Sequence, residues 1–178
     1  YTEQPDGCRI KLLDLGYKDP TPLYFWAKAN GTFRNVALFE GDYKVSPIEG
    51  PFFPVTEEEL SLKGVTDHNF KVTPYLKIKL VEVVPGEAGE VTVKFSLKRS
   101  TVPEGMEIGK KTISEAWLLC NTMPVVSYYN GGYNDELSVK KTLSRTSDET
   151  IENKDQEITL DKLKSGVKYY LRLAALSS

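Results

Sequence analysis

The sequence predicts an all-β protein made of two tandem antiparallel β-sandwiches. One turn pattern occurs twice, in LFEGDYKV and in LKSGVKYYLRL, and apolar residues alternate with polar ones in the segments around it. In each copy a leucine closes one strand, a glycine turns the chain, and a tyrosine, Tyr43 or Tyr169, opens the next strand. This is the arrangement of the tyrosine corner, in which the phenol bonds to upstream backbone. Two corners predict two sandwiches.

The length of the chain, 178 residues, suits two small domains. Hydrophobic residues make up 40% and charged residues 27%, which is ordinary for a globular protein. We place the first domain at residues 1–74 and the second at 75–178, because a new set of strands begins near Thr73 and Pro74. No flexible Gly/Ser linker separates them, so we expect a direct junction and a stiff rod.

In the first domain, strands are expected over 8–15, 23–29, 32–38 and 42–48. Asn30-Gly31 lies between the second and third of these and is a strong hairpin signal, since both central positions of a type I′ turn need positive φ. In the fourth, Tyr43, Val45 and Pro47 share one face. The prolines of GPFFPV make that segment an edge strand or a loop, because proline cannot donate to a ladder.

In the second domain, strands are expected over 76–80, 91–97, 113–120, 136–144, 156–163 and 167–176. The third of these contains Trp117, which we expect to fill the core. The fourth lies inside a long polar stretch. No strand pattern follows the last segment, so either a further strand is missing or an edge stays open.

The charge balance argues against nucleic acid and anionic lipid surfaces as partners. Lys and Arg number 23 against 25 Asp and Glu, the net charge is -2, and the two signs are interleaved, whereas both partners need a concentrated basic patch. No run approaches the roughly 18 apolar residues of a membrane helix, and no signal-peptide pattern is visible. Because the chain starts at Tyr1 and enters a strand almost at once, we expect it to be part of a longer precursor.

Cys8 and Cys120 lie in different predicted domains and neither belongs to a CxxC pair, so their spacing argues against zinc and thioredoxin-type chemistry. Two interpretations stay open for them. They form an interdomain disulfide, or each is a separate buried thiol.

The residues favour no enzyme, metal or cofactor. His68 is the single histidine, no GxSxG elbow accompanies it, and we expect it at a turn or strand end. Consecutive carboxylates such as Glu57, Glu58 and Glu59 cannot converge on one ion from an extended chain, so this triplet is expected to be a solvated loop or a strand start. No phosphate-binding loop and no DxDxDG calcium loop occurs. A glycosidase, which needs just two carboxylates at a defined separation, remains an alternative.

The segment SYYNGGYNDE is the most site-like part of the sequence. Tyr128, Tyr129 and Tyr133 offer flat apolar ring faces with polar tips, and Asn130, Asn134 and Asp135 offer amide and carboxylate groups. This mixture can stack on a sugar ring and bond its hydroxyls, so we predict a glycan-binding site here. The alternative is structural: the NGG triplet forms a hairpin turn, and the tyrosines pack on neighbouring strands.

A second group of aromatic residues lies in the first domain. Tyr24 and Trp26 share one face of their strand and Phe25 takes the other, so at least one set belongs to the core. Phe52 and Phe53 also point to opposite sides if extended. They are either packed in the interior or part of an interaction surface.

The runs DPTPLYFWAKANGTFRNVALFEGDYKVSPIEGPFFPV, FKVTPYLKI and GVKYYLRLAAL resemble a two-domain lipoprotein family of unknown function from Bacteroidetes. In that family NGTFRN, LFEGDYKV and GPFFPV recur in a transthyretin-like, or carboxypeptidase regulatory-like, first domain. PYLKI opens an immunoglobulin-like or fibronectin III-like second domain. The resemblance spans nearly the whole chain, is most specific in the first domain, and implies a further strand at each end.

The resemblance also implies a setting for the protein. Family members are similar to accessory proteins encoded beside TonB-dependent glycan importers, and their precursors carry a lipoprotein signal and an acylated cysteine absent from this chain. The protein is therefore expected in the outer membrane, lipid-anchored, as a non-catalytic accessory of polysaccharide uptake that binds glycan weakly or spaces other components. The alternative is a protein-interaction module that docks onto the importer complex through Phe52, Phe53 or an exposed sheet edge.

Overall fold

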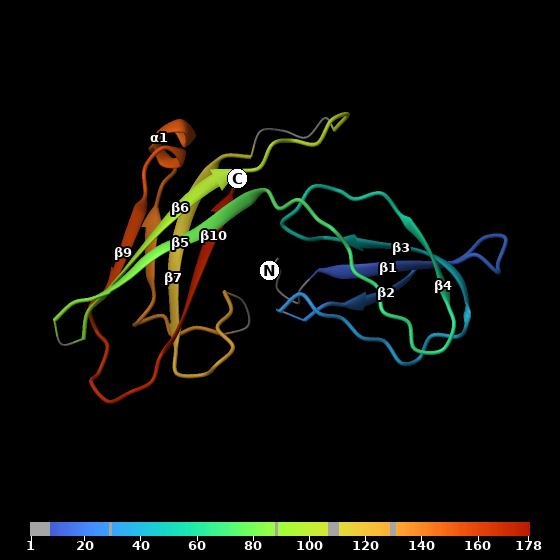
Figure 1. Cartoon of the computed structure of the whole chain (residues 1–178), viewed down its shortest axis with the longest axis horizontal. Helices are drawn as coiled ribbons and strands as arrows, with labels where there is room; N and C mark the ends of the chain where they lie inside the picture. The colour runs from blue at the N-terminus through green and yellow to red at the C-terminus, as the bar shows by residue number, and fades with distance from the viewer. Residues whose placement is uncertain (1–7, 29, 88, 107–110, 129–130) are drawn as a thin grey trace. The chain divides into compact units, whose positions relative to one another are not determined.

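The structure of the protein is a computed structural model that describes residues 8–28, 30–87, 89–106, 111–128 and 131–178. The chain divides into two compact units, Tyr1–Pro74 (unit 1) and Tyr75–Ser178 (unit 2). The strands of both units pair in antiparallel sheets, which confirms the predicted all-β fold class (Figure 1).

Unit 1 is built on one four-stranded sheet in the order β2-β1-β3-β4. Its strands are β1 (Arg9–Asp14), β2 (Leu23–Trp26), β3 (Gly41–Ile48) and β4 (Glu58–Leu62). The first three agree with predicted segments. The fourth strand begins at Glu58, within the triplet Glu57, Glu58 and Glu59. The sequence predicts either a solvated loop or a strand start for this triplet, and the structure shows the strand start.

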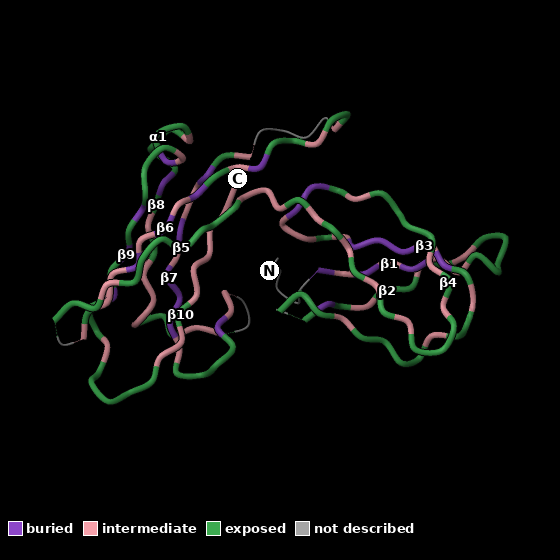
Figure 2. Tube along the Cα trace, viewed as in Figure 1, coloured by how far each residue is buried: buried purple, intermediate pink, exposed green. Residues whose placement is uncertain are grey.

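One face of this sheet is buried. Ile10 and Leu12 on β1 and Tyr43 and Val45 on β3 are each 2% exposed and form the centre of the unit 1 core. Figure 2 shows the buried stretches of these two strands in purple. Because side chains alternate along a strand, Arg9 and the other odd-numbered residues of β1 point to the opposite face. The unit therefore has an apolar side and a charged side.

The predicted strand over 32–38 is wrong, because no strand lies between β2 and β3 in the described part of the chain. A turn forms here, but it is not the predicted type I′ turn, because Gly31 has a φ of 80° whereas Asn30 is not among the described residues with positive φ. The N–H of Lys28 donates to the carbonyl of Thr32 at 2.7 Å. The carboxamide oxygen of Asn30 then accepts from the Thr32 N–H at 3.0 Å, and that of Asn35 accepts from the Ala37 N–H at 2.8 Å. Such local side-chain bonds compete with a ladder, so the segment runs as a loop.

Both tyrosine corners form as predicted. The Tyr43 hydroxyl donates to the carbonyl of Phe39 at 3.0 Å, just before β3 pairs with β1. The Tyr169 hydroxyl accepts from the Lys164 N–H at 3.2 Å, just before the last strand of unit 2. Each phenol thus ties the start of a strand to the backbone that leads into it.

Unit 2 is a sandwich of two three-stranded sheets, in the orders β5-β6-β9 and β10-β7-β8. Its strands are β5 (Leu76–Pro85), β6 (Val91–Arg99), β7 (Ile113–Asn121), β8 (Val139–Thr142), β9 (Gln156–Leu160) and β10 (Tyr170–Ser177), all of which overlap predicted segments. Alternate residues of β6, β7 and β9 fill the space between the sheets, led by Phe95, Leu97, Ala116 and Leu118.

One short helix, α1 (Asp148–Glu152), is not predicted by the sequence. Ser147 caps it by accepting from the Thr150 N–H at 3.3 Å, and Ile151 is fully buried in the core. The guanidinium of Arg99 bonds Glu152 at 2.6 Å and Asp148 at 2.8 Å, which fastens the helix to β6. The bond to Arg99 lowers the pKa of Glu152.

Trp117 does not fill the core, which corrects that prediction. Its neighbours Ala116 and Leu118 are core residues, so the alternation of β7 turns Trp117 to the outer face of the sheet. Cys8 and Cys120 are buried thiols, one in the core of each unit, as the second of the two interpretations expects.

We predict that Tyr43→Phe destabilises unit 1 by about 1 kcal/mol, because the variant loses a hydrogen bond to Phe39 in a side chain that is otherwise buried. The chain has two tryptophans, Trp26 in unit 1 and Trp117 in unit 2. Urea unfolding in a Trp117→Phe background, followed by Trp26 emission, therefore reports unit 1 alone.

The matched control is Tyr17→Phe in the same background, since Tyr17 is 69% exposed. We expect its unfolding midpoint to stay at the parent value. An equal midpoint for Tyr43→Phe would contradict a stabilising role of the corner hydroxyl.

Candidate functional site

Hydrogen bonds tie the segment that follows β7 back to the β10-β7-β8 sheet. Leu119 points to the outer face of this sheet and is nevertheless fully buried. Arg172, which lies opposite Leu119 on β10, donates through Nη1 to the carbonyl of Val126 at 2.9 Å. The Asn134 N–H donates to the carbonyl of Cys120 at 2.8 Å, which closes the returning end of the segment.

The returning segment is held by a tight turn and by side-chain caps. The Ser127 N–H donates to the carbonyl of Gly132 at 3.0 Å, and a Cβ on Gly132 would lie 2.7 Å from that of Ser127, so this position needs glycine. The carboxamide oxygen of Asn134 accepts from the N–H groups of Glu136 at 2.9 Å and Leu137 at 3.2 Å. The aromatic residues on the segment are thereby fixed relative to the sheet.

Three aromatic rings meet on this face, and we call Trp117, Tyr128 and Tyr133 the aromatic cluster. The rings of Tyr128 and Tyr133 are stacked, with centroids 5.9 Å apart and an interplanar angle of 10°. Trp117 meets Tyr128 edge-on at 5.3 Å and Tyr133 at 6.1 Å. All three side chains are half-buried, so each keeps part of its surface open to solvent.

Charged groups surround the aromatic cluster. The indole N–H of Trp117 donates to Glu115 at 3.0 Å, and Lys140 bonds the other oxygen of that carboxylate at 3.3 Å. The Lys140 ammonium also lies 5.4 Å from the centre of the Trp117 ring. The Tyr133 hydroxyl bonds the carboxylate of Asp135, and this bond raises the pKa of Tyr133. The cluster therefore presents ring surface next to both hydrogen-bond donors and acceptors.

The structure brings Tyr128 and Tyr133 of the predicted site together. Asn134 belongs to the same segment, but its oxygen bonds the backbone of the segment itself. Tyr129 and Asn130 lie outside the described residues. The sequence prediction does not include Trp117 in this site, because it assigns the residue to the core. Ala116 and Leu118 on either side of it are core residues, and strand alternation then predicts that Trp117 faces outward.

Phe52 and Phe53 are not an exposed interaction surface, which corrects that prediction. They are 4% and 3% exposed. Phe52 pairs with Pro74 in a β-bridge and the Phe53 N–H donates to the carbonyl of Thr73 at 2.9 Å, so the end of unit 1 holds this segment down. A Cβ on Gly50 would lie 1.7 Å from the Phe52 ring, which shows how closely the backbone approaches it.

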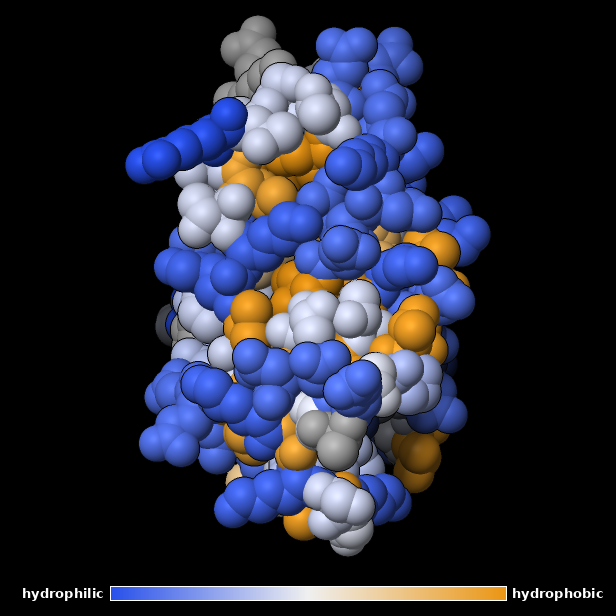
Figure 3. Space-filling view, turned by 90° about the vertical axis from the view of Figure 1, so that its left-hand side faces the viewer, coloured by the Kyte–Doolittle hydropathy of each residue, from blue (hydrophilic) through white to orange (hydrophobic). Residues whose placement is uncertain are grey.

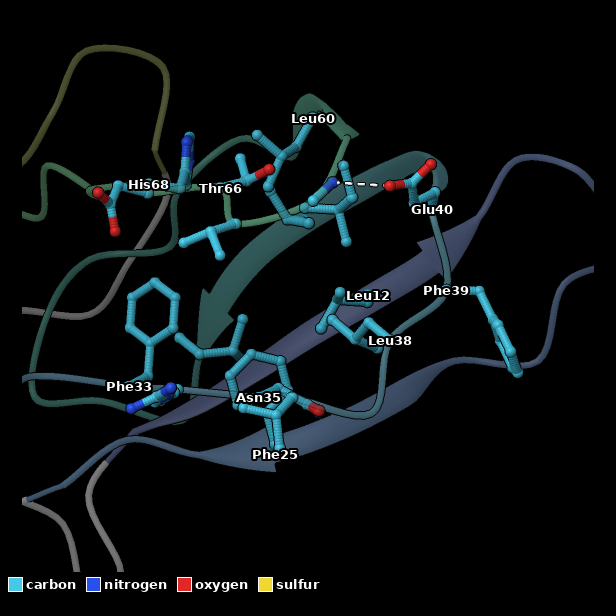
Figure 4. A pocket seen from close by; sticks show the side chains of 18 of the residues that line it. Leu12, Phe25, Phe33, Asn35, Leu38, Phe39, Glu40, Leu60, Thr66 and His68 are labelled. Carbon is cyan, nitrogen blue, oxygen red and sulfur yellow. Dashed lines mark hydrogen bonds between the residues drawn. The ribbon is translucent and has the colours of Figure 1, made fainter.

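Unit 1 contains a cavity of about 570 Å³ between its sheet and the loops at 33–40 and 64–70 (Figure 4). Leu12 and Val45 contribute to it from the sheet, and the aromatic rings of Phe25, Phe33 and Phe70 line it as well. The Gly64 N–H donates to the carboxylate of Glu40 at 2.9 Å and links the two loops. The lining is predominantly apolar.

Three large apolar side chains at this cavity are almost fully solvated. Val36 is 81% exposed, Phe39 is 86% exposed and Val65 is 99% exposed. Phe39 points away from the interior of the cavity in Figure 4. Together they give unit 1 an exposed apolar rim, a feature that marks contact sites in other proteins.

His68 also lines the cavity. Its Nε2 lies 3.0 Å from a carboxylate oxygen of Glu58, and its ring meets that of Phe70 edge-on with centroids 4.6 Å apart. Among the residues that the structure describes, no group of three or more His, Cys, Asp or Glu side chains is arranged to hold a metal ion.

In the described part of the chain, no helix is long and apolar enough to cross a membrane. On the face that Figure 3 shows, hydrophobic surface is divided into separate patches by hydrophilic side chains.

Comparison with known proteins finds a family match for the first unit. Residues 2–73 match the family described as "Protein of unknown function (DUF3823) N-terminal domain". No curated protein matches the chain.

Solved structures extend the likeness over both units. A DUF3823 family protein from Bacteroides uniformis ATCC 8492 is 20% identical with a TM-score of 0.79, covering 97% of this chain and 81% of that chain. A DUF3823 family protein from Bacteroides ovatus ATCC 8483 is 15% identical with a TM-score of 0.70, covering 99% and 84%. A protein from Bacteroides uniformis ATCC 8492 described as "a putative carbohydrate binding protein" is 21% identical with a TM-score of 0.66, covering 99% and 81%. At these identities the likeness establishes the fold.

The bond between Tyr133 and Asp135 makes a prediction about titration. In Asp135→Asn the negative charge that opposes phenolate formation is gone, so the pKa of Tyr133 falls toward the usual value of about 10. A pH titration of tyrosine ¹³Cζ resonances, with the Tyr133 signal assigned from Tyr133→Phe, measures this. Glu136→Gln removes the next carboxylate along the chain and is the control; an equal shift in both variants would contradict a specific bond.

Proposed function

We propose that the protein is a non-catalytic, glycan-binding accessory lipoprotein of an outer-membrane polysaccharide-uptake system. The observation that carries this proposal is the aromatic cluster, with Tyr128 stacked on Tyr133 beside Trp117. The protein would be held to the outer membrane through a lipid anchor outside this chain. Its partners would be a polysaccharide and components of the importer, with no role for nucleic acid.

The physical argument for a sugar rests on the combination of ring and polar groups. A pyranose has apolar C–H faces and equatorial hydroxyls, so it gains from a flat aromatic surface flanked by donors and acceptors. The cluster offers partly exposed rings, with Lys140 as a donor and the carboxylates of Glu115 and Asp135 as acceptors. Its rings are already packed against one another, so binding would order few additional side chains.

Two further points support the proposal. One structural neighbour is described as a putative carbohydrate binding protein. The sequence also resembles a family whose members are similar to proteins encoded beside glycan importers, and this resemblance supports the proposal. Because the rings share their faces with one another, only part of each is available to a ligand, and we expect the affinity for a single sugar chain to be weak.

We predict that Tyr128→Ala and Tyr133→Ala each weaken glycan binding by about fivefold, since an aromatic contact contributes about 1 kcal/mol. Isothermal titration calorimetry against soluble neutral polysaccharides, including xyloglucan and galactomannan, measures the change. Tyr17→Ala removes an exposed tyrosine of unit 1 and should bind like the parent protein. Absence of binding across a broad glycan panel would refute the ligand role.

A second candidate function is docking to another protein through the apolar rim of Val36, Phe39 and Val65. Burial of the Phe39 ring alone would contribute about 2 kcal/mol to such a contact. We expect a pull-down from native outer membrane to recover importer components without added sugar, and Phe39→Ser to recover less than a tenth as much. Equal recovery by Phe39→Ser and the parent would exclude this rim as the contact.

A further inference from the structure

Unit 1 presents a pair of exposed aromatic rings, apart from the aromatic cluster of unit 2. Tyr24 and Trp26 on β2 are each 47% exposed, whereas Phe25 between them packs against the unit 1 core. The alternation of the strand therefore places both rings on the charged face of the sheet. From this pair we infer a second sugar-binding site, which we call the Tyr24–Trp26 platform, for a neutral polysaccharide chain.

Arg9 holds the two rings in place. It lies directly opposite Trp26 in the pairing of β1 with β2. Its guanidinium is 4.6 Å from the centre of the Tyr24 ring and 5.4 Å from the centre of the Trp26 ring. A cation held against two aromatic rings restricts their rotation, so the exposed surface of the rings is preorganised before a ligand arrives.

The charges beside the rings determine the class of sugar. Arg9 forms an ion pair with Glu49, and Lys11 forms one with Glu57 at 2.8 Å. The hydrogen bond and the charge of Glu57 also raise the pKa of Lys11, so Lys11 keeps its charge through the neutral range. Because Arg9 and Lys11 are each matched by a carboxylate, neither of them is left to select a uronic acid or a sulfated sugar. The same four groups still offer donors and acceptors to neutral hydroxyls.

The platform is accessible from the edge of the sheet. In the order β2-β1-β3-β4, β2 is an outermost strand, so a polymer can lie across Tyr24 and Trp26 and continue past the sheet. The cavity of unit 1 lies on the other side of the sheet, since Phe25 lines it. The platform is thus separate from the cavity, and its residues belong to a different unit from those of the aromatic cluster.

This inference names the same class of ligand as the proposed function but rests on different residues, and each site contains one of the two tryptophans. A Trp117→Phe variant keeps Trp26 as the reporter for unit 1, and a Trp26→Phe variant keeps Trp117 as the reporter for unit 2. Both are titrated with xyloglucan and galactomannan, with polygalacturonate as the anionic comparison, and binding is followed by tryptophan emission and by calorimetry.

We expect Trp26 emission to respond to at least one neutral polymer, with an affinity that changes by less than about twofold between 50 and 500 mM salt because no net charge is engaged. Tyr24→Ala in the Trp117→Phe background should weaken that response by about threefold or more. Tyr17→Ala in the same background is the matched control. Thermal unfolding of each variant confirms that unit 1 remains folded.

The outcomes separate the two sites. If the protein binds polymer by calorimetry and Trp117 responds while Trp26 does not, the platform is refuted and the proposed function stands. A response from Trp26 alone keeps the platform and refutes the aromatic cluster as the binding site. A response that Tyr24→Ala leaves unchanged, or a salt-sensitive preference for polygalacturonate, overturns the inference as stated.

Discussion

The two-residue period of the antiparallel strand is the constraint on which the rest of this structure depends. Once Ile10 and Leu12 are committed to the core of unit 1, Arg9 and Lys11 must face the other way, and the same holds for Trp117 between two core residues of β7. A shift of one residue in either strand would exchange the two sets. Burial of the apolar set therefore fixes which aromatic and charged side chains the protein displays.

Those displayed aromatic residues are restrained in two different ways. In unit 2 a folded-back segment, closed at Gly132, packs Tyr128 and Tyr133 onto Trp117. In unit 1 a guanidinium from the neighbouring strand is held against the rings of β2. Both arrangements reduce the rotamer entropy that an exposed aromatic side chain would otherwise lose on binding, which costs about 0.5–1.5 kcal/mol per side chain. Fixed rings next to matched charges suit a ligand that is flat, neutral and rich in hydroxyls.

Sequence reasoning found what depends on local spacing and missed what depends on longer contacts. The tyrosine corners follow from leucine, glycine and tyrosine at short intervals, and the alternation of β6 follows from its own residues. The apolar residues of 32–38 predict a strand, but the side chains of Asn30 and Asn35 bond the backbone there and favour a loop. Phe52 forms a β-bridge with Pro74, which lies far along the chain, and Tyr133 contacts Trp117 because a long segment returns to β7. Neither contact can be predicted from the residues around it in the sequence.

The cavity of unit 1 follows from the same architecture. A single sheet buries its apolar face only if something covers it, and here the cover consists of two loops whose residues Phe33, Leu38 and Phe70 are only half-buried. The two loops are linked by the bond from Gly64 to Glu40 and by the contact of the Phe33 and Phe70 rings, and space remains between them and the strands. An apolar group that entered this space would remove lining atoms from water and gain the contacts they lack, about 25 cal/mol for each Å² buried. The exposed side chains of Phe39 and Val65 at the rim add to that gain, because a group that covered them would remove further apolar surface from water.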